Sequence, residues 1–161
     1  MKNVTILDGG MGQELIKRTS RKLTPLWSAD VMLHEPNLVR DVHAEFINNG
    51  AEVITLNTYT ATPQRLTRDG SIELLKPLHE AAIKAAQEAI SASGKTETKI
   101  AACLPPLVAS YHPEDSMPFE EALRSYQQLV ELQSDAADIF LCETMSSIKE
   151  AKAACTAAKE A

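Results

Sequence analysis

The chain has 161 residues, of which 44% are hydrophobic, 24% charged and 4% aromatic, and its formal net charge is −6. This composition excludes disordered and collagen-like chains. Three cysteines are too few for a disulfide scaffold and favour a reducing, cytoplasmic setting. The acidic balance without a basic stripe argues against nucleic-acid binding. The longest mostly apolar stretch, residues 100–109, contains two prolines and is too short for a membrane span.

Four short apolar runs predict β-strands at residues 4–7, 53–56, 99–104 and 139–142. None alternates apolar and polar residues, which is typical of strands in a parallel sheet with both faces covered. Apolar residues at helical spacing predict four helices, which start near Pro36, Leu75, Phe119 and Ile148. A strand followed by a helix, repeated four times, predicts an α/β fold with right-handed crossovers.

The spacing of the strands bears on the architecture, since they start near positions 4, 52, 99 and 138. A doubly wound sheet and a (β/α)8 barrel both fit this order. Eight units at this spacing need roughly 300 residues, which is within the usual size of a barrel. The last segment favours a helix up to Ala161 and has no C-cap. We therefore expect residues 1–161 to form about the first four βα units of a larger barrel domain.

Polar residues follow the predicted strands at the edge where active sites of parallel α/β folds gather. Asp8 precedes the glycine-rich segment 9–12, and Glu143 follows the fourth strand. Asn57, Thr58 and Tyr59 follow the second. The glycines allow close approach of a ligand to the backbone, but their spacing is not that of a dinucleotide fingerprint. Alternatives are a helix cap for Asp8, and a surface ion pair or a charge at a helix N-terminus for Glu143.

Other polar and aromatic residues give weaker signals. Trp27 lies in a long first crossover, where it either covers a substrate or plugs the barrel rim. Arg65, with its neighbours Gln64 and Arg68, either faces an anionic group or begins a solvated helix. The four histidines lack zinc-site spacing and are expected at packing or surface positions. The three cysteines are expected to be inert thiols, with a reactive alternative only for Cys142.

Four segments carry a family resemblance, and they follow one another in the family's order: residues 6–15, 26–29 with 34–36, 50–59 and 142–144. In these segments the chain resembles the homocysteine S-methyltransferase family, whose members depend on S-methylmethionine, betaine or cobalamin. The resemblance implies a (β/α)8 barrel that transfers a methyl group to the sulfur of homocysteine to give methionine. The donor is a sulfonium, an ammonium or a folate/cobalamin compound.

The resemblance also implies roles for individual residues. Asp8, Gly9 and Glu143 match positions that hold the amino-acid part of homocysteine. Trp27 and Tyr59 match aromatic positions that line the donor pocket in betaine-type members. Asn57 and Thr58 complete the rim of the second strand. Homocysteine and a methyl donor are the expected partners.

The family's cofactor is zinc, which three cysteine thiolates of the second half of the barrel hold. Cys103, Cys142 and Cys155 do not match those ligand positions, so no zinc ligand is expected in this chain. Residues 104–109 also depart from the usual family loop, which leaves the donor open.

We expect the chain alone to be incomplete and inactive, and to self-associate through open sheet edges. One alternative is a non-catalytic oligomer of half-barrels that binds an amino acid. The other is an unrelated, metal-independent α/β enzyme that uses Asp8 and Glu143 as acid and base.

Overall fold

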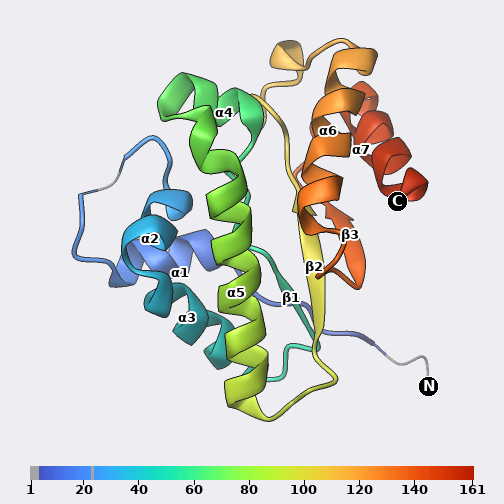
Figure 1. The fold of residues 1–161 in the computed structure, drawn as a ribbon. Coiled ribbons are helices and arrows are strands. Elements are labelled where there is room, and N and C mark those ends of the chain that lie inside the picture. Colours follow the sequence, from blue (N-terminus) through green and yellow to red (C-terminus); the bar gives the residue numbers. More distant parts are fainter. Residues whose placement is uncertain (1–3, 23) are drawn as a thin grey trace.

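A computed structural model describes residues 4–22 and 24–161. Residues 1–3 and 23 of the predicted barrel part, 1–161, lie outside the described residues. Figure 1 shows a small sheet with helices α1, α2, α3 and α5 toward one side and α6 and α7 toward the other. The elements, in chain order, are α1 (Met11–Arg18), α2 (Ser28–His34), α3 (Pro36–Asn48), β1 (Val53–Thr55), α4 (Pro63–Asp69), η1 (Ile72–Leu74), α5 (Leu75–Ser93), β2 (Lys99–Leu104), η2 (Pro113–Asp115), α6 (Phe119–Gln133), β3 (Ile139–Cys142) and α7 (Ile148–Glu160).

The sheet is parallel, with the strand order β1-β2-β3. This confirms the predicted α/β fold with a parallel sheet, and three of the four predicted strands. Residues 4–7 follow β1 for only one bridge pair, Leu7 with Val53. Val4 is 79% exposed and Ile6 54% exposed. The first apolar run therefore continues the sheet at its edge without forming a strand of several paired residues.

The four predicted helices are present as α3, α5, α6 and α7. Pro36 occupies the first turn of α3, and Gly94 caps α5 in the left-handed conformation with φ +69°. Helices α1 and α2 are not among the four predicted helices, and they lie in the long first crossover. No helix in the described part of the chain is long and apolar enough to cross a bilayer.

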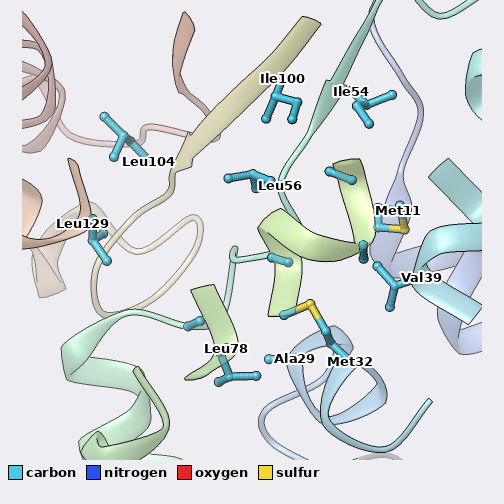
Figure 2. Close-up of a cluster of buried hydrophobic side chains, with 14 of the residues drawn as sticks. Met11, Ala29, Met32, Val39, Ile54, Leu56, Leu78, Ile100, Leu104 and Leu129 are labelled. Carbon is cyan, nitrogen blue, oxygen red and sulfur yellow. The ribbon is translucent and has the colours of Figure 1, made fainter. Parts of the chain in front are cut away.

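The hydrophobic core lies between the sheet and the helices that cover it. Figure 2 shows Leu78 of α5 near Ala29 and Met32 of α2, in the same buried cluster as Ile54 of β1 and Met11 of α1. Helix α3 packs on α5, and α6 packs on α7. Alanines dominate the buried face of α5, which brings this helix close to its neighbours. This packing fixes the carboxyl ends of the strands, where the polar residues lie.

Candidate functional site

A cavity of about 620 Å³ opens at the carboxyl ends of the strands. Six of the seven predicted site residues line it, and Thr58 does not. The lining also includes residues that the sequence did not single out, from α1, from the segment before α2 and from the loop after β2. The polar and aromatic lining residues are Asp8, Gln13, Trp27, Ser28, Thr55, Asn57, Tyr59, Thr60, Arg65, Ser110, Tyr111, Glu143 and Thr144.

Asp8 lines the cavity and accepts hydrogen bonds from Thr55 at the end of β1. Its Oδ2 accepts a hydrogen bond from the backbone N–H of Thr55 at 2.7 Å, and its Oδ1 accepts one from the Thr55 hydroxyl at 2.9 Å. Burial raises the pKa of Asp8 to about 6, and the charge of Glu143 adds to the rise. The alternative of a helix cap is not observed, because the N-cap residue of α1 is Gly10 and no side chain caps this helix.

Glu143 lies at the end of β3, close enough to Asp8 to influence its pKa. Its Oε1 accepts a hydrogen bond from the Cys103 thiol at 3.0 Å. Burial and the charge of Glu143 raise the pKa of Cys103 well above its usual value, so this thiol stays protonated. Glu143 belongs to none of the ion pairs between described residues, so the alternative of a surface ion pair is not observed.

Glycines next to Asp8 allow two aromatic rings to pack against the backbone. A Cβ atom at Gly9 would lie 2.8 Å from the ring of Phe46, and one at Gly12 would lie 2.5 Å from the indole of Trp27. Gly12 is therefore the surface on which Trp27 packs at the edge of the cavity. The absence of side chains in the glycine-rich segment 9–12 therefore makes room for the aromatic ring of Trp27 in the cavity wall.

Backbone strain concentrates around this cavity. Trp27, Tyr111 and Thr144 have positive φ angles of 52°, 64° and 58°, and they are the only non-glycine residues with positive φ in the described part of the chain. All three line the cavity. Such conformations cost about 1–3 kcal/mol each and cluster at functional sites. Nothing in the sequence pattern signals them, because they depend on tertiary packing.

Tyr59 and Arg65 form one wall. The Arg65 guanidinium lies over the Tyr59 ring, 5.4 Å from its centroid, and the Tyr59 hydroxyl is 2.7 Å from the Ser110 hydroxyl. The side chain of Asn57 donates a hydrogen bond to the backbone carbonyl of Ser28 at 3.2 Å, which ties the end of β1 to α2. Of the three polar residues Gln64, Arg65 and Arg68 in α4, only Arg65 lines the cavity.

Thr58 points away from the cavity into the core. Its hydroxyl donates a hydrogen bond to Gln133 Oε1 at 3.2 Å. The same oxygen accepts from the backbone N–H of Cys103 at 3.0 Å, and Gln133 Nε2 donates to the Cys103 carbonyl at 3.2 Å. Gln133 thus links α6, β2 and the end of β1. The placement suits a structural role for Thr58, in place of the predicted contact with substrate.

The described residues do not form a zinc site. No group of three or more His, Cys, Asp or Glu side chains among them is arranged to hold a metal ion. The sulfur atoms of Cys142 and Cys155 lie 3.8 Å apart. The third thiol, Cys103, does not join them and donates a hydrogen bond to Glu143. A catalytic zinc needs at least three protein ligands. The residues present therefore do not fit the three-thiolate zinc that the resemblance implies.

The chain is similar to a bacterial methyltransferase over almost its full length. It is 30% identical over 165 aligned positions to the homocysteine S-methyltransferase of Escherichia coli strain K12, an alignment that covers 94% of this chain and 53% of the relative. It is 38% identical over 65 residues to a selenocysteine methyltransferase of Astragalus bisulcatus, covering 40% of this chain and 19% of that protein. The chain spans about half the length of the bacterial relative.

Solved structures give the same picture. The crystal structure of the E. coli homocysteine methyltransferase MmuM in its oxidized form matches with a TM-score of 0.83 and 28% identity, covering 98% of this chain and 60% of that one. The metallated form matches with a TM-score of 0.82 and 25% identity, covering 99% and 60%. The sequence model described as homocysteine S-methyltransferase matches residues 5–161. The chain therefore belongs to the homocysteine S-methyltransferase family.

Proposed function

We propose that this chain is the homocysteine-binding part of a methyltransferase that moves a methyl group from a sulfonium- or ammonium-type donor to the homocysteine thiol, which yields methionine. The observation that carries the proposal is the convergence of Asp8, Glu143 and the backbone of Gly9 on one cavity with aromatic walls. Family membership removes the alternative of an unrelated α/β enzyme.

The polar end of the cavity suits the head of an amino acid. Asp8 and Glu143 supply two carboxyl groups, and an ammonium group between them would relieve their mutual repulsion. The backbone N–H groups of Gly9 and Gly10 donate no hydrogen bond within the described part of the chain. They remain free to take a carboxylate, as consecutive amides do in anion-binding loops.

The aromatic end suits a donor with an onium charge. The rings of Trp27 and Tyr59 both line the cavity. A cation over such a ring gains roughly 0.5–2 kcal/mol, depending on how far it is desolvated. These two residues would therefore orient the methyl donor. The described residues offer no zinc ligand set, and we derive no step of the transfer through that metal.

The wider setting of the chain forms part of the same proposal. The bridge pair between Leu7 and Val53 continues the parallel order of β1, β2 and β3, which supports four βα units of a (β/α)8 barrel. Three free cysteines are in keeping with a reducing, cytoplasmic compartment. The exposed apolar residues at 4–7 and Ile139 at the start of β3 would favour self-association of the isolated chain.

Calorimetric titration of the chain with L-homocysteine tests the proposal. Micromolar to millimolar binding by wild type is expected. Asp8→Asn and Glu143→Gln should each weaken it at least about tenfold, because a lost charge-assisted hydrogen bond costs about 1.5–3 kcal/mol. Asp135→Asn, the same change at an exposed position, is the matched control. Absence of binding by wild type, or equal binding by all variants, would overturn the proposal.

A further inference from the structure

Two cysteines lie side by side outside the cavity lining. The sulfur atoms of Cys142 and Cys155 are 3.8 Å apart. Cys142 is the last residue of β3, and Cys155 lies in the middle of α7, 13 residues further along the chain. All three cysteines of the chain are free thiols. The proposed binding of homocysteine uses neither Cys142 nor Cys155.

Neighbouring elements hold the two sulfur atoms in place. Strand β3 pairs with β2, and Cys142 itself is the register partner of Leu104. Helix α7 contacts β3 and packs against α6 (Figure 1). The buried face of α7 carries Ala153, Ala154 and Ala157, whose small side chains bring the helix close to its neighbours. A movement of less than about 2 Å therefore separates the two sulfur atoms from the length of a disulfide bond.

The two thiols differ in access to solvent. Cys155 is exposed, whereas Cys142 is only partly exposed. Lys152 and Lys159 lie three residues before and four residues after Cys155, on the same face of α7. Both lysines are exposed, and neither belongs to an ion pair between described residues. An anionic oxidant therefore meets two ammonium groups beside Cys155.

The two thiols also differ in ionisation. Burial, the hydrogen bond with Cys155 and the charge of Cys155 raise the pKa of Cys142 to about 12, so Cys142 stays protonated at neutral pH. The exposed Cys155 is therefore the thiol that reacts first. Once Cys155 is joined to another sulfur it carries no charge, and it no longer opposes the ionisation of Cys142.

We propose that Cys142 and Cys155 form a reversible oxidation site, at which a low-molecular-mass disulfide such as glutathione disulfide converts the two thiols to a disulfide within one chain. The Cys155 thiolate attacks one sulfur of the oxidant, the S–S bond of the oxidant breaks, and one glutathione leaves as a thiolate. Cys142 then loses its proton and attacks the Cys155 sulfur, and the second glutathione leaves.

The exchange is balanced. The protein loses two protons and two electrons and gains one S–S bond, while the oxidant loses its S–S bond and takes up the electrons as two glutathione thiols. The new bond joins α7 to the end of β3, directly before the cavity residues Glu143 and Thr144. This inference goes beyond the proposed function and does not depend on it.

Peptide mapping of the whole chain tests the proposal. The reduced chain is incubated with glutathione disulfide, quenched with acid, alkylated and digested with trypsin without reduction. Cleavage after Lys149 and Lys152 separates the two cysteines, because Cys142 lies in peptide 125–149 and Cys155 in peptide 153–159. Wild type should give the crosslink between these two peptides as its main oxidised product, and dithiothreitol should remove it. No crosslink, a lasting glutathione adduct at Cys155, or a crosslink between two chains overturns the proposal.

Variants test the order of the two thiols. Cys142→Ser should accumulate a glutathione adduct on Cys155, because the second thiol is missing. Cys155→Ser should form an adduct on Cys142 at least about tenfold more slowly. Faster reaction of Cys142 would contradict the proposed order.

The third cysteine supplies the matched control. Cys103 is buried and donates its hydrogen bond to Glu143, so Cys103→Ser should form the crosslink as wild type does. If this variant does not fold, peptide 100–124 of wild type decides the same point, because it should stay free of crosslinks.

Urea denaturation shows whether the native fold accepts the bond. Crosslinked wild type should unfold at a higher urea concentration than the reduced chain, because the bond restricts the unfolded segment 142–155. Dithiothreitol should restore the lower midpoint, and Cys155→Ser treated with the same oxidant should not shift. A lower midpoint after crosslinking would mean that the native positions of the sulfur atoms do not suit the bond, and it would contradict the proposal.

Discussion

Replacing Asp8 with asparagine should change how the stability of the folded chain depends on pH. The pKa of this carboxyl is about 6 in the fold and 3.8 without it. Between these values the folded state keeps a proton that the unfolded state has lost. The free energy of unfolding therefore falls as pH rises from about 4 to about 6, and the loss is complete above that range. The Asn variant lacks this loss.

The magnitude follows from the shift. A rise from 3.8 to about 6 is about 2 pKa units, and at 1.36 kcal/mol per unit it corresponds to about 2–3 kcal/mol. Loss of the hydrogen bonds to Thr55 lowers the stability of the variant by an amount that changes little with pH. The difference in stability between variant and wild type should therefore shift in favour of the variant by about 2–3 kcal/mol between pH 4 and pH 7.

His43 makes the comparison with wild type necessary. Burial without any hydrogen-bond partner lowers the pKa of His43 to about 4, so the unfolded state binds its proton first as pH falls below 6.5. Its contribution to stability therefore rises with pH over the window in which that of Asp8 falls. Burial also lowers the pKa of His79, which acts in the same direction as His43, so only the difference between variant and wild type isolates Asp8.

Urea denaturation followed by far-UV circular dichroism, at intervals of one pH unit from 4 to 8, gives this difference directly. Asp135→Asn serves as the exposed control and should follow wild type at every pH. A difference between Asp8→Asn and wild type that stays constant from pH 4 to pH 7 would refute the reasoning. So would a carboxyl carbon of Asp8 that titrates near pH 4 by NMR.

Three further results are expected. Gly12→Ala should displace the indole of Trp27, shift its emission and lower stability by about 1–3 kcal/mol, whereas Gly10→Ala, whose nearest contacts are at 3.8 Å, should leave the emission unchanged. Gln133→Leu should lower the free energy of unfolding in urea by about 2–4 kcal/mol, because it leaves the backbone N–H and carbonyl of Cys103 without their hydrogen-bond partners. Tyr126→Phe loses only the hydrogen bond to the Pro105 carbonyl and should lower it by about 1 kcal/mol. Equal losses in the two variants would contradict this expectation. Zinc titration with a competing chelator should detect no stoichiometric site, and one tight zinc per chain would show that prediction to be wrong.

The parts of the fold that could be predicted are those with a repeating pattern. The stripe from Leu75 to Ala89 has helical spacing and is capped by Gly94, and residues 100–104 are uniformly apolar, as a covered parallel strand requires. Helices α1 and α2 have only eight and seven residues, too few for a period to stand out. The apolar run 4–7 forms only one bridge pair, because the length of a strand depends on how many residues of a neighbouring strand pair with it, and the sequence of the run does not contain that information.

The candidate site divides in the same way. Asp8, Asn57, Tyr59 and Glu143 could be placed at the cavity because each directly follows an apolar run, and parallel strands end at one edge. Thr58 does not line the cavity, since adjacent residues beyond a strand point in different directions and its hydroxyl donates to the buried amide oxygen of Gln133. Ser110 and Tyr111 are brought in by a loop whose path depends on tertiary contacts.

The positive φ angles of Tyr111 and Thr144 beside the cavity also affect which substitutions the sequence can accept. Glycine adopts positive φ without the cost that a side chain adds, so glycine at Thr144 or Tyr111 would raise the stability of the fold. The same change would free the loops that carry Glu143 and Ser110 and blur the shape of the cavity. Selection for thermal stability alone would therefore favour loss of Tyr111 and Thr144 from the cavity lining. Substitutions that stabilise the chain without loss of the site should be sought on the outer faces of α5 and α6 instead.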